Sequence, residues 1–168
     1  MMQPDSRNRY GSISRFLHWS MALGIALMFL LALAWHIDAR WRVLVPAHKA
    51  LGTVLLMLLL FRIIWAIASE TRPAAGNRAV RCGHFALYVL MLTVPGIALL
   101  RDAARGRDGN AENALTHFGD LWHGRSAWFL LALVVGHIAM TVIHQRRGEK
   151  VLQRMAGRQP PAGGDDKG

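Results

Sequence analysis

Three histidines on one face of a single apolar helix are the residues best placed to carry chemistry. Residues 121–147 read LWHGRSAWFLLALVVGHIAMTVIHQRR and hold His123, His137 and His144. His137 follows His123 by about four helical turns and His144 follows by about two more, so all three share one face. His123 and His137 would lie about 21 Å apart along the axis, whereas one metal ion needs ligands about 2 Å away. The spacing therefore predicts two separate ligand positions at two depths.

The alternative is that these histidines are interfacial or pore-lining side chains that bind nothing. An ionisable side chain inside a membrane is unfavourable and usually has a functional partner. The helices that carry the histidines decide whether these residues are ligands or bind nothing.

The composition predicts a membrane domain. Of the 168 residues, 53% are hydrophobic, and they form long blocks with the charges between them, as in transmembrane proteins. The formal net charge of +10 suits loops that face phospholipid headgroups, and we expect no nucleic-acid partner. The single cysteine, Cys82, excludes an internal disulfide, covalent haem attachment through C-x-x-C-H, and a cysteine-ligated cluster.

Four apolar blocks long enough to cross a bilayer predict an all-α membrane protein, a bundle of four transmembrane helices. The blocks are residues 16–35, 50–69, 83–100 and the stretch 121–147. We expect residues 1–15 to be an amino-terminal segment and residues 16–145 to be the transmembrane domain. Residues 146–168 form a basic tail that we expect to be disordered from about residue 159. Pro95, inside the third block, predicts a kink that neighbouring helices accommodate.

The basic residues predict the orientation. The amino-terminal segment, the linker between the second and third blocks, and the tail hold most of the 20 lysines and arginines. The positive-inside rule places these segments in the cytoplasm. We therefore expect both termini to be cytoplasmic in a multi-pass protein that contacts membrane lipid.

This orientation pairs the histidines by depth. His48 enters the second helix from the outer side, at the depth of His123, and His18 enters the first helix from the cytoplasmic side, at the depth of His137. Haem iron takes two axial ligands, which two facing helices of a bundle can supply, and neutral imidazoles add no charge to the lipid. We expect two b-type haems, with iron bound by His48 and His123 outside and by His18 and His137 inside.

Other histidines remain open as ligands. His84 begins the third helix at about the depth of His18, which makes it the main rival for the inner iron. His144 lies on the ligand face but precedes a polar, basic segment at the interface. We expect His36 and His117 in loops or at the surface.

Arginines and glycines near the histidines also suit a haem protein. Arg62 follows His48 by about four turns, at the inner depth, and a lone arginine in a span needs a partner. A haem propionate is the first candidate, and snorkelling to the cytoplasmic surface is the alternative. Arg15 is a second expected contact of the inner cofactor. Gly52 and Gly136 leave room for a porphyrin, although small residues also serve helix packing.

An outer basic set could neutralise haem propionates or attract an anionic reactant. Its members are Lys49, Arg101, Arg105, Arg107 and Arg125. Nearby acidic residues dilute this field, namely Asp102, Asp108, Glu112 and Asp120.

The ordered set of motifs resembles a known family. It runs Arg15-Phe-Leu-His18-Trp19, His48-Lys-Ala-Leu-Gly52, Arg62, Gly83-His84-Phe-Ala-Leu-Tyr88, Val94-Pro95-Gly96, Trp122-His123, Gly136-His137 and Val151-Leu-Gln-Arg154-Met155. Over residues 10–156 this order resembles the bacterial cytochrome b561 family. The resemblance implies a four-helix bundle in the inner membrane that holds two b haems on His18, His48, His123 and His137.

The resemblance also implies an activity. At least one type of member is a superoxide oxidase, which takes an electron from periplasmic superoxide and passes it through the haems to ubiquinone. The alternative is a haem electron carrier or a membrane anchor for a partner dehydrogenase or cytochrome. A third class, a cofactor-free membrane protein such as a transporter, would leave four depth-matched histidines as coincidence. The sequence identifies no catalytic residue for the superoxide reaction.

Overall fold

The computed structural model describes residues 3–6, 10–69, 78–106, 111–148 and 151–156, and all regular structure in them is helical. The elements are α1 (Ser12–Ile37), the 3-10 helix η1 (Ala39–Leu44), α2 (Val45–Ala68), α3 (Arg78–Ala104), α4 (Ala114–Arg146) and α5 (Val151–Ala156). α1, η1 with α2, α3, and α4 give four candidate membrane spans by length and hydropathy. This confirms the predicted all-α membrane fold with four transmembrane helices.

The helices extend beyond the apolar blocks because local capping sets their ends. α4 begins at Ala114, where the Asn113 side chain accepts hydrogen bonds from the backbone N–H groups of Leu115 and Thr116. Residues 36–49, between the first two apolar blocks, are largely helical, since α1 runs to Ile37 and η1 leads directly into α2. Between them, Asp38 accepts hydrogen bonds from the side chain and backbone of Arg40, which lower the pKa of its carboxyl.

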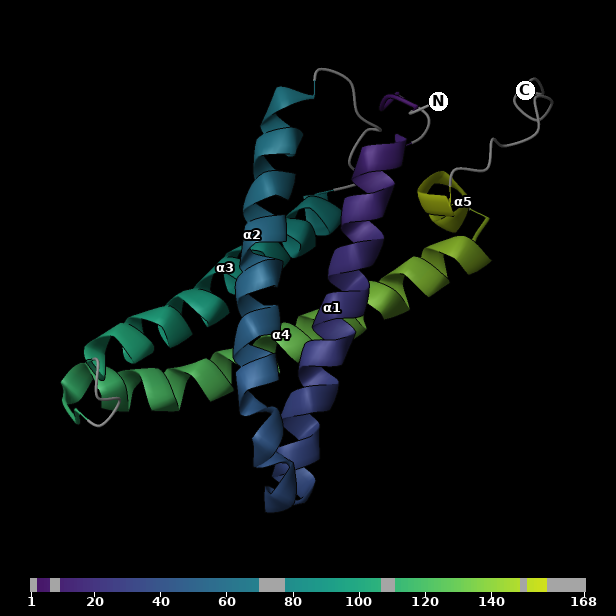
Figure 1. The fold of residues 1–168 in the computed structure, drawn as a ribbon. Helices are drawn as coiled ribbons and strands as arrows, with labels where there is room; N and C mark the ends of the chain where they lie inside the picture. Colours follow the sequence, from purple (N-terminus) through teal and green to yellow (C-terminus); the bar gives the residue numbers. More distant parts are fainter. Residues whose placement is uncertain (1–2, 7–9, 70–77, 107–110, 149–150, 157–168) are drawn as a thin grey trace, which may run out of the picture.

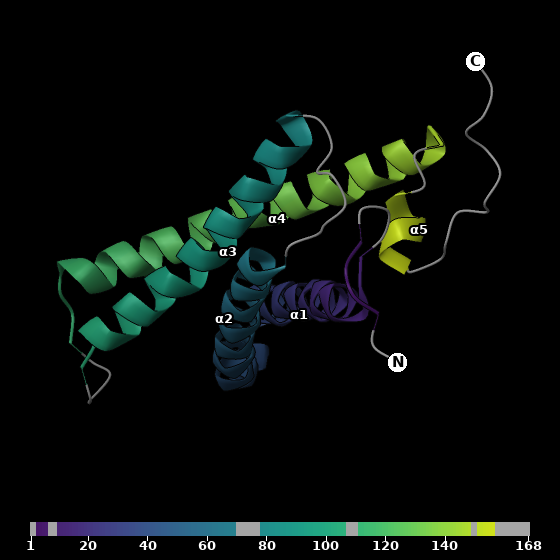
Figure 2. The same ribbon diagram turned by 90° about the horizontal axis from the view of Figure 1, so that it is seen from above.

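The four long helices form two hairpins that cross. α1 packs along α2 and α3 packs along α4, and Figure 2 shows the second pair running across the first. Two glycines allow close approach within the hairpins. A Cβ on Gly24 would lie 2.5 Å from Leu55 Cδ2 of α2, and a Cβ on Gly119 would overlap Arg101 of α3. Close packing within each hairpin therefore determines which helix faces are left to contact the other hairpin.

Both described ends of the chain lie on the same side of the bundle (Figure 1). Arg15 Nη1 donates a hydrogen bond to the Ala156 carbonyl at 3.1 Å, and Trp19 Nε1 donates to the Met155 carbonyl at 3.3 Å. α5 is thus held against the start of α1. The segment expected to be disordered, from residue 159, lies outside the described residues.

The core is small, as expected for helices that face lipid. The buried apolar side chains are Leu17, Met21, Leu59, Val94 and Leu130. Many other large apolar residues are exposed on the helices, where they contact lipid acyl chains instead of protein. α3 remains helical through Pro95.

Candidate functional site

His48 of α2 and His123 of α4, the pair expected at the outer side, face each other. Their ring centroids are 6.4 Å apart, with an interplanar angle of 83°. Both side chains are half-buried. The structure therefore brings together the two outer histidines that depth alone had paired.

Each outer imidazole has a neighbour that orients it. His123 Nδ1 lies 3.0 Å from the Val94 carbonyl of α3, and donation from Nδ1 would leave Nε2 free to bind a metal. The Trp35 ring of α1 meets the His48 ring edge-on, with centroids 5.0 Å apart. Neither contact was predictable from the sequence, because a backbone acceptor on another helix, such as the Val94 carbonyl, has no residue signature.

The structure gathers three histidines in the group expected at the inner side, namely His18, His137 and the rival ligand His84. The ring centroids of His84 and His137 are 5.1 Å apart, with an interplanar angle of 81°. His18 lies near enough to both to interact with them electrostatically. His18 and His137 are half-buried, whereas His84 is exposed and its Nδ1 lies 2.7 Å from the Val80 carbonyl of its own helix.

The two arginines predicted to contact the inner cofactor have different surroundings. Arg62 of α2 donates from Nε to the Tyr88 hydroxyl of α3 at 2.7 Å, and it interacts electrostatically with His18 and His137. Its half-buried side chain therefore joins the inner histidine group. Arg15 instead contacts α5 through its Nη1, and its role toward a cofactor stays a prediction.

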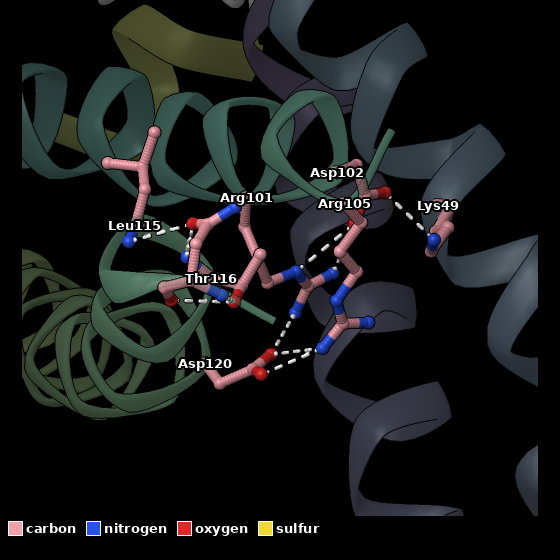
Figure 3. A network of polar contacts seen from close by, with 8 residues as sticks. Lys49, Arg101, Asp102, Arg105, Leu115, Thr116 and Asp120 are labelled. Carbon is pink, nitrogen blue, oxygen red and sulfur yellow. Dashed lines mark hydrogen bonds and ion pairs between the residues drawn. The ribbon is translucent and has the colours of Figure 1, made fainter. Parts of the chain in front are cut away.

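Ion pairs neutralise much of the outer basic set (Figure 3). Lys49 Nζ lies 2.8 Å from Asp102, and Arg101 lies 2.9 Å from Asp102 and 3.4 Å from Asp120. Arg105 binds Asp120 at 2.7 Å. Three cations and two carboxylates leave a net charge of about +1 in this cluster, so its long-range field is weak.

Arg125, His36 and His117 lie at the periphery. Arg125 lies over the Trp122 ring at 5.8 Å. His36 and His117 are exposed, which confirms their expected surface positions, although both lie on helices. Arg107 and Asp108 fall outside the described residues.

Comparison with known proteins identifies the family. The family model described as prokaryotic cytochrome b561 matches residues 9–158. The chain belongs to the prokaryotic cytochrome b561 family. Its sequence is 28% identical over 181 residues, 92% of this chain and 94% of the relative, to a protein named cytochrome b561 homolog 2 from Escherichia coli (strain K12). No solved structure matches the chain.

Membership in the cytochrome b561 family, with four candidate spans, makes this chain a multi-pass protein of the bacterial inner membrane. The family implies b-type haem and haem-based electron transfer across the membrane. In the described part of the chain, no group of three or more His, Cys, Asp or Glu residues could hold a metal ion. A haem iron takes two axial ligands from the protein, so pairs of imidazoles are the donor sets to compare with this structure.

The outer pair fits a cytochrome b561 haem well. Iron–nitrogen bonds of about 2 Å, with about 1 Å more from each nitrogen to its ring centre, separate two ligating imidazole centroids by roughly 6 Å. The His48–His123 separation of 6.4 Å matches this value. His48 Nδ1 is buried and lacks a hydrogen-bond partner among the described residues. An iron bound between the two imidazoles would need about this separation.

The two glycines near the ligands differ in their surroundings. A Cβ on Gly52 would lie 3.3 Å from Met28 Cε of α1, which favours the alternative that this glycine serves helix packing. A Cβ on Gly136, beside His137, would meet no described atom within 4 Å. Of the two, only Gly136 has the open surroundings that a porphyrin edge needs.

Proposed function

We propose that this cytochrome b561 binds two b haems, oxidises superoxide at its outer side and reduces ubiquinone at its inner side. The proposal rests on the His48–His123 pair in the first half of α4, with His137 about four turns further along the same helix. Haem supplies one-electron chemistry when bound. The chain contributes axial imidazoles at two depths and a dry helix bundle between them.

For the inner haem we propose His18 and His137 as the ligands. The His84 and His137 rings, with centroids 5.1 Å apart, are closer than the roughly 6 Å that an intervening iron requires. His18 belongs to the same group and comes from α1, so it can approach from a different helix. His84 is then a neighbour that packs beside the ligand His137.

The proposed orientation places the His48–His123 pair at the periplasmic side. It rests on the excess of basic residues at the amino terminus, the 70–83 linker and the tail. In the proposed reaction, two superoxide anions each give up one electron and leave as oxygen. One ubiquinone accepts the two electrons and two protons and becomes ubiquinol.

A haem electron carrier, or an anchor for a partner dehydrogenase or cytochrome, is the second candidate. The ion pairs of Lys49, Arg101 and Arg105 favour it, because they leave little field at the outer face to attract superoxide. Stopped-flow measurement distinguishes the two functions. Purified protein is mixed with a superoxide source, and haem reduction and then reoxidation by a ubiquinone analogue are followed by absorbance.

Rapid reduction by superoxide and quinone-dependent reoxidation support the enzyme, whereas absent reduction by superoxide with rapid reduction by a chemical donor supports the carrier. His123→Ala should remove the outer haem signal. His117→Ala, an exposed histidine on the same helix, is the matched control and should change nothing. A colourless wild-type protein from haem-sufficient cells would rule out both functions.

A further inference from the structure

The Arg62–Tyr88 hydrogen bond is a polar contact between α2 and α3 beside the inner histidines. Arg62 Nε donates to the Tyr88 hydroxyl oxygen at 2.7 Å, and both side chains are half-buried. Tyr88 lies one turn after His84 on α3. The contact therefore places a cation and a phenol at the wall of the inner histidine group.

This hydrogen bond leaves donors on both residues. The guanidinium has five N–H groups and a phenol has one O–H. Because the Tyr88 oxygen accepts from Arg62, its own proton can be donated to a third group. Arg62 Nη1 is buried and has no hydrogen-bond partner among the described residues. Leaving such a buried donor unsatisfied is unfavourable.

Arg62 forms no ion pair with a carboxylate among the described residues. Asp38, Asp102 and Asp120 form their ion pairs toward the opposite ends of the helices, and Asp5 accepts hydrogen bonds from the Gly11 backbone and the Ser14 hydroxyl. The imidazoles of His18 and His137 lie near Arg62. A guanidinium with an unsatisfied Nη1 and a phenol that can still donate its proton are suitable donors for a carboxylate.

We propose that Arg62 and Tyr88 together bind one propionate carboxylate of the inner haem. Arg62 donates from its terminal nitrogens and Tyr88 from its hydroxyl, while the bond between the two residues fixes their geometry. Tyr88 is thus a binding residue for the inner haem. The sequence did not reveal this role, because a tyrosine among apolar residues is typical of a side chain that packs between helices. The inference rests on the proposed inner haem.

The pair has a measurable effect on the inner haem. A carboxylate that is neutralised by a cation and a hydrogen bond favours the ferric state less than a bare one, so removing either donor lowers the midpoint potential. For Tyr88→Phe we expect the reduction equilibrium to fall about fivefold, which is the net effect of one lost hydrogen bond of ordinary strength. For Arg62→Gln we expect at least tenfold, which is 59 mV for a one-electron couple.

Potentiometric titration of the full-length holoprotein, followed by absorbance, measures both haems separately. Thr93→Val is the matched control, because it removes a hydroxyl from α3 that donates only to the Val89 carbonyl of its own helix. Infrared redox-difference spectra, on protein whose haem carries 13C at the propionate carboxyls, provide a second readout. Tyr88→Phe should shift the labelled carboxylate band, and Thr93→Val should not.

A lower inner potential with a shifted labelled band, at full haem content and unchanged outer potential, supports the proposal. An unchanged inner potential in Tyr88→Phe, or a shifted potential without a shift of the labelled band, overturns it. If Arg62→Gln does not accumulate, Tyr88→Phe carries the test alone, since it deletes one oxygen. Wild-type protein with only one haem would overturn the proposed function instead, so the two failures are distinguishable.

Discussion

Replacing Asp102 with asparagine tests whether an ion pair holds the two hairpins together beside His48, a ligand of the proposed outer haem. Asp102 of α3 binds Lys49 of α2 at 2.8 Å and Arg101 of its own helix at 2.9 Å (Figure 3). The Lys49 contact joins one hairpin to the other, directly beside His48. We expect Asp102→Asn to loosen that junction.

The exposures of these side chains set the magnitude. Lys49 is 51% exposed and Asp102 is 33% exposed, so water screens their attraction and the pair contributes about 0.2–1 kcal/mol. Arg101 is only 16% exposed but keeps Asp120 at 3.4 Å as a second partner. The combined loss in unfolding free energy should therefore be about 1 kcal/mol.

Unfolding in mixed micelles with added denaturing detergent measures this loss, and the outer-haem absorbance reports the local geometry. Asp120→Asn is the matched control. It also removes two ion pairs, to Arg101 and Arg105, but both lie within the α3/α4 hairpin. We expect similar losses of stability from both variants, with a changed outer-haem band only in Asp102→Asn.

A double-mutant cycle with Lys49→Met isolates the contact between hairpins. The coupling energy should be about 0.2–1 kcal/mol. Equal disturbance of the outer-haem band by both aspartate variants, or no coupling between Lys49 and Asp102, would refute this reasoning.

Two further predictions concern packing and the tail. Gly24→Val should lower the free energy of unfolding by about 1–3 kcal/mol, because even its Cβ would lie 2.5 Å from Leu55 Cδ2. Chemical unfolding measures this loss. In the control Gly124→Ala the new Cβ meets no described atom within 4 Å, so stability should be unchanged or raised. Arg15→Gln removes the hydrogen bond to the Ala156 carbonyl and should speed proteolysis of α5; an unchanged cleavage rate would show that this contact does not hold α5.

Much of this architecture was predictable because it depends on local properties. The length of an apolar block determines whether a helix can cross the bilayer, so the four spans followed from composition. The helical period determines depth and face, so His48 was correctly placed opposite His123. Helix ends were less accurate, since caps such as Asn113 extend helices beyond the hydrocarbon.

The lateral arrangement around the bundle could not be obtained in the same way. Depth placed His18 and His84 at the same level but could not tell which would lie against His137, and the close ring contact proved to be with His84. The neutralisation of Lys49 by Asp102 likewise depends on two helices meeting. These contacts are set by how one hairpin crosses the other.

The sequence by itself therefore determined the number of spans, the pairing of His48 with His123 and the family of the protein. Only the tertiary structure decided the partners of Arg62, the backbone acceptor of His123 and the ion pairs at the outer face. The physical reason is that periodicity along a helix specifies a face and a level. Close packing between helices determines which faces meet, for example where the missing side chain of Gly24 leaves room for Leu55.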